Sequence, residues 1–122
     1  LEAKGHEVEL TGIFYHLGEN DMSFHPYRKQ AAERLQAIIA QSRKDLERPA
    51  LKWYVSQQPP TDDKSVNNID VVANIAMAAA VDPTLIHLKA FNLPSQEKKL
   101  VISTAGIVEL GEFIAKSYLG HQ

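Results

Sequence analysis

The sequence predicts an α/β fold with three layers, in which flanking helices cover a mainly parallel sheet. Short apolar segments typical of strands alternate with longer segments whose apolar residues recur every three or four positions, the period of a helix. The order along the chain is strand, helix, strand, helix, strand, helix, which favours parallel strands joined by crossover helices. With 122 residues the chain is long enough for one hydrophobic core. We therefore expect residues 1–122 to form a single domain.

The composition is that of an ordinary globular protein, with 44% hydrophobic and 23% charged residues. The formal net charge is -2 and the basic residues form no stripe, so a nucleic-acid partner is not expected. No apolar run approaches the roughly 20 residues of a membrane span, so no membrane segment is expected either. The absence of cysteine excludes disulfides, thiolate metal sites and a cysteine nucleophile, and the sequence predicts no cofactor.

The first strand is expected to begin at residue 8 and to run on through residues 12–17. Its apolar residues alternate with polar ones at the start and are continuous later, as in a strand that enters the covered middle of a sheet. A polar turn follows at residues 18–21. Open α/β sheets bind ligands beyond the carboxyl ends of their strands, so this turn is the first candidate for a functional site. Its Gly, Asn and Asp are also typical of a plain turn between a strand and a loop.

The first helix is expected over residues 26–47, with Ser23 or His25 as its cap and Pro26 in its first turn. Arg48 and Pro49 end it. One apolar stripe runs along the segment at spacings of three and four residues: Tyr27, Ala31, Leu35, Ile38, Ile39, Ser42 and Leu46.

The second strand is expected over residues 51–56, where apolar and polar side chains alternate. Trp53 is in phase with the apolar residues of this strand, which favours a place in the core over a place in a sugar site. Gln57 and Gln58 follow, either as part of a polar pocket or as a plain connector. The second helix is expected to begin after a cap at Ser65 or Asn67 and to end near residue 80. Its inward-facing residues are expected to be Ile69, Val72, Ile75, Ala76 and Ala79.

A third strand is expected at residues 85–88 and a short apolar segment at residues 100–102. The last helix is expected to begin at a cap formed by Ser103 or Thr104 and to end near residue 119. Its inner face is expected to carry Ile107, Leu110, Ile114 and Tyr118. A sheet of three strands is small, and an uncovered edge strand invites pairing with another strand.

Two groups of polar residues are weighed as metal or catalytic sites. His16 and His25 flank the turn that contains Asp21, but their spacing matches no metal-binding motif, so His16 is interpreted as a polar histidine at the rim of the sheet. Asp82 and His87 are close in sequence, and His87 falls within the third strand. We therefore expect a hydrogen-bonded histidine there and not a catalytic pair.

Residues 12–21, Gly-Ile-Phe-Tyr-His-Leu-Gly-Glu-Asn-Asp, resemble the third conserved block of SGNH-type ester hydrolases. The branch that this segment resembles is that of the sialate O-acetylesterases and carbohydrate acetylesterases, in which a strand ends in W-x-Q-G-E-S-D. Residues 103–115 are similar to the segment that follows the catalytic D-x-x-H of the same family. The resemblance covers residues 8–119 and implies the C-terminal half of a flavodoxin-like SGNH domain.

The resemblance implies acyl transfer. In this family a serine attacks the ester carbonyl, a histidine acts as base, an aspartate orients the histidine, and donors that include an asparagine stabilise the oxyanion. By this resemblance Asn20 matches the oxyanion asparagine, and a carbohydrate ester is the implied substrate. Tyr15 stands where the acetylesterases have Trp, and Leu17 where they have a hydrogen-bonding Gln. The implied binding residues are His16, Gly18, Glu19, Asn20 and Asp21.

The same resemblance places Lys98 at the position of the family's aspartate and Val101 at that of its histidine. Valine exchanges no proton, and lysine does not orient an imidazole as a carboxylate does. The family's nucleophile lies near the start of its domain, outside the part that this chain resembles. No G-D-S, G-Q-S or G-x-S-x-G motif is present. Catalysis by this chain alone is therefore not expected.

Three hypotheses stay open. In the first, the chain is part of an ester hydrolase-like domain whose parent activity is deacetylation of O-acetylated carbohydrates. In the second, it is a non-catalytic pseudo-hydrolase that binds a glycan or a protein. In the third, it is a fragment or subunit completed by another chain. The sequence begins at Leu1 and not at Met, so we expect a fragment or processed product. Its partner would be a missing N-terminal half or a second copy. The resemblance slightly favours a secreted or periplasmic location.

Overall fold

The computed structural model describes residues 5, 7–17, 25–57, 69–89 and 102–121. The elements in chain order are β1 (Ile13–Leu17), α2 (His25–Asp45), β2 (Trp53–Gln57), α3 (Ile69–Val81), β3 (Leu85–His87) and α4 (Thr104–Gly120). Strands and helices alternate as the sequence predicts. Within these ranges, no helix is both long enough and apolar enough to cross a membrane.

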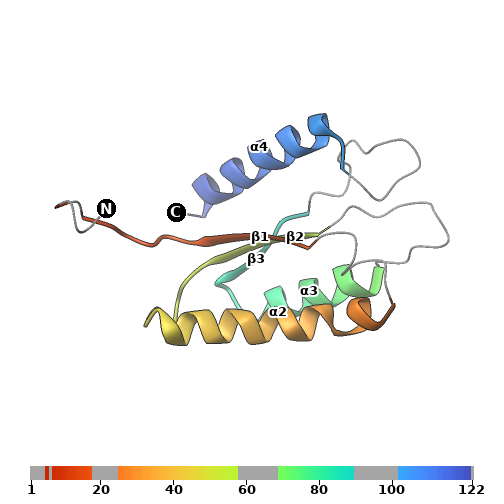
Figure 1. The fold of residues 1–122 in the computed structure, drawn as a ribbon, viewed down its shortest axis with the longest axis horizontal. Helices are drawn as coiled ribbons and strands as arrows, with labels where there is room; N and C mark the ends of the chain where they lie inside the picture. Colours follow the sequence, from red (N-terminus) through yellow and green to blue (C-terminus); the bar gives the residue numbers. More distant parts are fainter. Residues whose placement is uncertain (1–4, 6, 18–24, 58–68, 90–101, 122) are drawn as a thin grey trace.

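The strands form one parallel sheet in the order β1-β2-β3. Trp53 of β2 lies opposite Ile13 of β1 and Leu85 of β3, so the three strands begin level with one another. Helices α2 and α3 lie on one face of the sheet and α4 lies on the other (Figure 1). The predicted α/β fold, with three layers and a parallel sheet, is confirmed.

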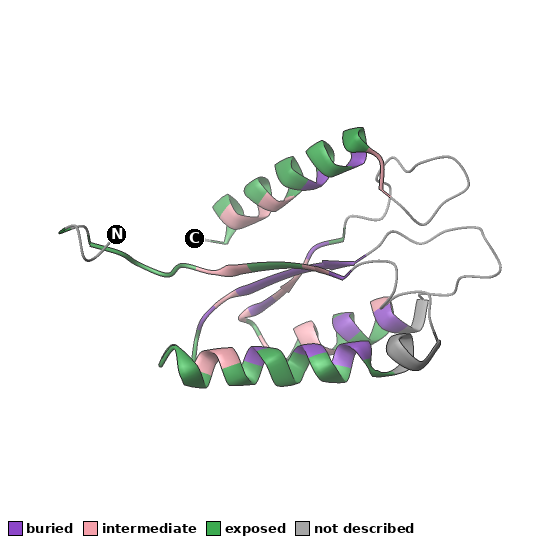
Figure 2. Ribbon diagram, viewed as in Figure 1, coloured by how far each residue is buried: buried purple, intermediate pink, exposed green. Residues whose placement is uncertain are grey.

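The hydrophobic core lies between the sheet and the helices α2 and α3. Val55 of β2 and both Val71 and Ile75 of α3 are completely buried. The other described members of this core cluster also come from outside α4: Leu17, Ala31, Ala32, Leu35, Ile39, Leu51, Trp53 and Leu85. On α4 the buried residues are Gly106 and Leu110, and Figure 2 shows most of that helix exposed. Because apolar burial is the main favourable term in folding, the α2/α3 side of the sheet contributes most of the stability.

Arg43, near the end of α2, connects three parts of the chain. Its Nη1 pairs with Asp82 Oδ2 at 2.8 Å. Its Nη2 donates to Thr84 Oγ1 at 2.6 Å, and its Nε donates to the carbonyl oxygen of Leu51 at 3.1 Å. Burial raises the pKa of Asp82, but hydrogen bonds from Thr84 and Arg43 and the charge of Arg43 outweigh it, so the pKa lies below its ordinary 3.8. The guanidinium therefore holds the segment before β2 and the connection from α3 to β3 against α2.

The expected first strand is confirmed at its carboxyl end, where β1 ends at Leu17, but it is wrong at its start and in its environment. Residues 8–12 form no strand, and their apolar side chains Val8 and Leu10 are exposed. β1 is an edge strand and not a covered one, with Phe14 and Tyr15 exposed at 47% and 36%. The covered strand is β2, which is buried along its whole length because it pairs on both sides. An apolar run favours burial, but it does not show which other segment of the chain packs against it.

The apolar stripe of α2 is narrower than predicted. Leu35 and Ile39 are buried, whereas Ile38 and Leu46 are exposed, and the helix ends at Asp45 and not at residue 47. A helix that packs on one face of a sheet buries a single stripe, so the residues beside that stripe face outward. Trp53, predicted to pack in the core, does so, and its Nε1 donates to Ser42 Oγ at 3.1 Å.

The inner faces of α3 and α4 also differ in detail from the predicted ones. In α3, Val71 is buried and Ala76 is exposed. In α4, Ile107 is exposed and Leu110 is buried, because this helix is the only described one on its face of the sheet. The predicted cap of α4 is confirmed, since the Oγ atom of Ser103 accepts from the backbone N–H of Gly106 at 3.2 Å.

The remaining boundaries divide into two groups. The third strand is confirmed and ends at His87, and His25 is the first residue of α2 and not its cap. The predicted caps Ser23, Ser65 and Asn67 lie outside the described residues, as do residues 100–101 of the short apolar segment.

Candidate functional site

The carboxyl ends of the strands bring four polar side chains to one edge of the sheet. His16 of β1 lies opposite Ser56 of β2, Gln57 is the last residue of β2, and His87 is the last residue of β3. We call these four residues the rim cluster. The carboxyl edge of an open α/β sheet is where such folds bind their ligands. The rim cluster is therefore the candidate site in the described part of the chain.

His16 and Ser56 form the first pair of the rim cluster, with His16 Nδ1 and Ser56 Oγ 2.7 Å apart. A serine hydrogen-bonded to a histidine is the arrangement of a nucleophile with its general base. Ser56, however, is only 1% exposed and lies within an extended strand, whereas a nucleophilic serine stands on a sharp, exposed turn. This contact therefore links β1 to β2 and leaves the hydroxyl no approach to an ester carbonyl.

Gln57 and His87 form the second pair, with Gln57 Oε1 2.5 Å from His87 Nε2. Gln57 is completely buried, and its Nε2 has no hydrogen-bond partner among the described residues. Burial lowers the pKa of His87, and the positive charge of Lys89 lowers it further. The imidazole of His87 is therefore neutral at neutral pH, so it adds no charge to the rim.

Of the residues predicted for this edge from the sequence, His16 is described. The others lie outside the described residues and their roles stay predictions: Gly18, Glu19, Asn20 and Asp21, together with Lys98 and Val101. Leu17 is described and is 2% exposed within the core cluster. Its side chain therefore packs in the core and adds nothing polar to the rim. In the described ranges no group of three or more His, Cys, Asp or Glu residues could hold a metal ion.

Ser56 and His87 were not among the predicted site residues, although the sequence holds a signal for both. Each is a polar residue near the end of an apolar strand, and strand ends in a parallel sheet meet at one edge. Asp82, considered as a partner of His87, binds Arg43 and Thr84 instead. The expectation of a hydrogen-bonded His87 outside a catalytic pair is confirmed.

A comparison with protein families bears on this rim. A family model described as carbohydrate esterase, sialic acid-specific acetylesterase matches residues 1–120. The chain belongs to this carbohydrate esterase family. The match includes all the described strands and helices, and it confirms the resemblance of residues 12–21 and 103–115 at the level of the family. No curated protein matches the chain, and no solved structure matches it.

In this member of the family the described part of the rim consists of two side-chain pairs that join neighbouring strands. Ser56 and Gln57 are both buried, so the pairs order the strand ends from within the protein. The rim cluster thus orders the carboxyl ends of β1, β2 and β3. The rim cluster lies at the edge where α/β folds place their ligand sites, but Ser56 and Gln57 are buried as structural residues are.

Proposed function

We propose that this chain is the C-terminal part of an acetylesterase domain that removes O-acetyl groups from carbohydrates, and that the chain by itself does not hydrolyse esters. The observation that supports this most directly is the burial of Ser56, the serine that pairs with a rim histidine. Two further serines have structural roles. Ser42 accepts from Trp53 and donates to a helix carbonyl, and Ser103 caps α4.

The substitutions at the family's catalytic positions support the same proposal. Lys98 and Val101 replace the aspartate and the histidine that the resemblance implies. Valine exchanges no proton, and lysine does not orient an imidazole as a carboxylate does. Leu17, at the position of a hydrogen-bonding glutamine, packs in the core. We assign Asn20 to the oxyanion and place His16 and residues 18–21 along one wall of the carbohydrate ester site. The nucleophile would come from outside this chain.

The purified chain is expected to hydrolyse p-nitrophenyl acetate and an O-acetylated sugar no faster than buffer does. Because Ser56 is buried, Ser56→Ala is expected to give the same rate as the unchanged chain. Asn20→Ala is expected to give that rate too, because the chain alone has no activity for the substitution to remove. The measurement is release of p-nitrophenol and of acetate against protein concentration. Turnover proportional to protein concentration would contradict the proposal, and its loss in Ser56→Ala would identify that serine as a nucleophile.

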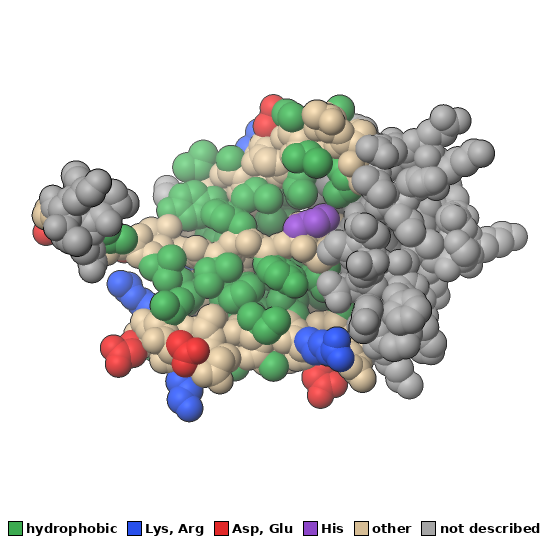
Figure 3. All heavy atoms as spheres, in the orientation of Figure 1, with side chains coloured by type: hydrophobic (Ala, Val, Ile, Leu, Met, Phe, Trp, Pro, Cys, Tyr) green, Lys and Arg blue, Asp and Glu red, His purple; other side chains and the backbone are tan. Residues whose placement is uncertain are grey.

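A second candidate function, a subunit completed by another chain, rests on the outer edge of β1. Phe14 packs near Tyr118 of α4, with ring centroids 5.9 Å apart, and Tyr15 lines a shallow cavity of about 110 Å³ together with Ile38 of α2. These residues make an apolar strip from α4 across β1 to α2. Figure 3 shows hydrophobic side chains gathered over the sheet and on the adjoining sides of the helices. Among the described residues β1 pairs with a strand on one side, and an edge strand with apolar flanks suits a further strand, from an N-terminal half or a second copy.

Size-exclusion chromatography with light scattering tests this candidate. A partner strand from a second copy predicts an assembly at least twice the 13.6 kDa of one chain. Tyr15→Lys places a charge on the exposed edge, and it is expected to shift that assembly toward the monomer. A stable monomer of the unchanged chain would count against a second copy as the partner. A non-catalytic glycan-binding role is favoured instead if that monomer binds on a glycan array.

A further inference from the structure

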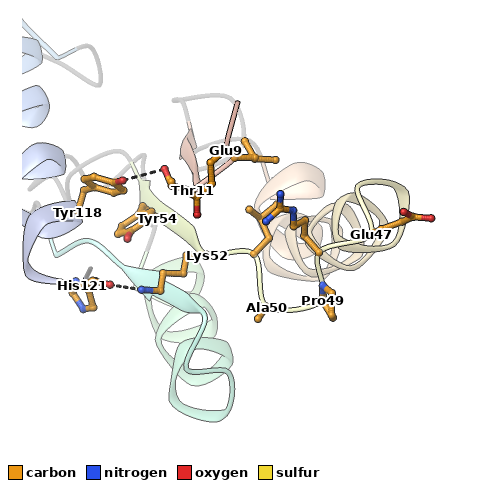
Figure 4. A pocket seen from close by; sticks show the side chains of 12 residues that line it. Glu9, Thr11, Glu47, Pro49, Ala50, Lys52, Tyr54, Tyr118 and His121 are labelled. Carbon is orange, nitrogen blue, oxygen red and sulfur yellow. Dashed lines mark hydrogen bonds between the residues drawn. The ribbon is translucent and has the colours of Figure 1, made fainter. Parts of the chain in front are cut away.

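A cavity of about 550 Å³ lies at the opposite end of the sheet from the rim cluster. It is open to solvent and is lined by residues 9–11 before β1, residues 47–52 before β2, Tyr54 and the end of α4 (Figure 4). Its volume falls in the range of about 300–1,000 Å³ that is usual for small-molecule sites. No member of the rim cluster lines it, so it is separate from the candidate ester site.

Tyr54 of β2 forms an inner wall of this cavity and is 1% exposed. Its ring packs against those of Phe14, Tyr118 and His121, with centroids 5.0, 5.8 and 6.2 Å away. Its hydroxyl makes no hydrogen bond in the part of the chain that the structure describes. This hydroxyl is not among the buried polar atoms that lack a partner in the described ranges, so it reaches the cavity and is available to a ligand. Burial raises the pKa of Tyr54, and Tyr118 raises it further, so the hydroxyl keeps its proton and can donate.

Further polar groups surround the same cavity. The hydroxyl of Tyr118 donates to Thr11 Oγ1 at 3.0 Å, and the ammonium group of Lys52 donates to the carbonyl oxygen of His121 (Figure 4). An ammonium group has three N–H donors, and a threonine hydroxyl both donates and accepts. Lys52 and Thr11 therefore keep hydrogen-bonding capacity for a ligand beyond the contacts they make with the protein.

The charged side chains that line the cavity balance one another. Glu9 and Glu47 oppose Arg48 and Lys52. A cavity without net charge gives no electrostatic preference to a phosphate or a free carboxylate. Aromatic walls with a few converging hydroxyl and ammonium groups instead suit a neutral ligand that has apolar C–H faces and several hydroxyls. A sugar ring has both.

We propose that this cavity binds a neutral saccharide. The sugar ring lies against Tyr118, and its hydroxyls bond to the Tyr54 hydroxyl and to the Lys52 ammonium group. The site attaches the chain to a glycan independently of the rim. It does not depend on whether the rim hydrolyses an ester.

The test is a titration of the whole isotope-labelled chain, followed by nuclear magnetic resonance, with the methyl glycosides of glucose, galactose and xylose. The amide signals of Thr11, Lys52 and Tyr54 are expected to shift with a dissociation constant of about 1–10 mM for the sugar that fits, as is usual for a ligand of one ring. The amides of His16 and His87 at the rim are expected not to shift. Absence of any shift with all three glycosides would overturn the proposal. Tighter binding of glucuronate than of every neutral glycoside would overturn it as well.

A matched pair of variants separates ligand binding from stability. Tyr54→Phe removes only the hydroxyl, which bonds to no described residue, so the melting temperature is expected to stay the same or rise. The dissociation constant of the glycoside is expected to increase about three- to tenfold, the effect of one lost hydrogen bond. Tyr15→Phe removes a hydroxyl from an exposed side chain outside the cavity, and it is expected to change neither quantity. Equal affinities of the unchanged chain and Tyr54→Phe would refute the assignment.

Discussion

Replacing Arg43 with alanine is expected to lower the free energy of unfolding by about 2–3 kcal/mol, because a charged hydrogen-bond donor to three groups is lost. The side chains of Arg43 and Asp82 are only 15% and 30% exposed, so water replaces the lost contacts incompletely. The change also releases the segment before β2 and the connection from α3 to β3. Urea unfolding followed by the fluorescence of Trp53, the single tryptophan and a core residue, measures the loss.

The pH dependence gives an internal check on this prediction. The pKa of Asp82 in the folded chain lies below 3.8, so its charged interactions are complete above that pH and are lost as pH falls through the folded value. The difference between the unchanged chain and Arg43→Ala should therefore be constant near neutrality and shrink in strong acid. Lys44→Ala removes a neighbouring charge from an exposed position and should change the unfolding free energy by no more than about 0.5 kcal/mol. Equal losses in the two variants would contradict the role of Arg43.

The order and type of the elements could be predicted because local periodicity determines them. The alternation in residues 51–56 and the spacing of Leu35 and Ile39 are properties of the strand and of the helix themselves. The exposure of Phe14 could not be predicted in this way. An apolar side chain on an edge strand gives the same sequence pattern as one in a covered strand. The pattern indicates apolar surface, but it does not show which segment packs against that surface.

The candidate edge could be predicted from the order of the elements, whereas its contacts could not. Parallel strands bring their carboxyl ends to one edge whatever their register, so a site beyond β1 and β2 follows from the fold class. The pairs His16–Ser56 and Gln57–His87 depend on the register, and a slip of one residue would turn each side chain to the other face. Two isolated strand sequences do not specify that register.

The two faces of the sheet differ in what packs against them. The α2/α3 face holds the core cluster, while the α4 face holds the aromatic rings around Tyr54 and the saccharide cavity. Ring contacts and hydroxyl pairs on the α4 face leave space and polar groups for a ligand. The α2/α3 face therefore has to supply most of the free energy of folding. Substitutions at single positions on that face measure its contribution.

Ile75→Ala is expected to have the second large effect, a loss of about 2–5 kcal/mol in the free energy of unfolding, because it opens a cavity in the core. Ile75 is 0% exposed on the side of α3 that faces the sheet, whereas Met77 on the same helix is 69% exposed. Met77→Ala is therefore the matched control, with an expected change of no more than about 0.5 kcal/mol. The urea midpoints of both variants are compared with the same m-value applied to each, and they measure the difference in the free energy of unfolding. Similar losses at the two positions would mean that the α2/α3 face is not the core. A large loss at Ile75 alone, with unchanged glycoside affinity in the folded variant, would locate stability and ligand binding on opposite faces of the sheet.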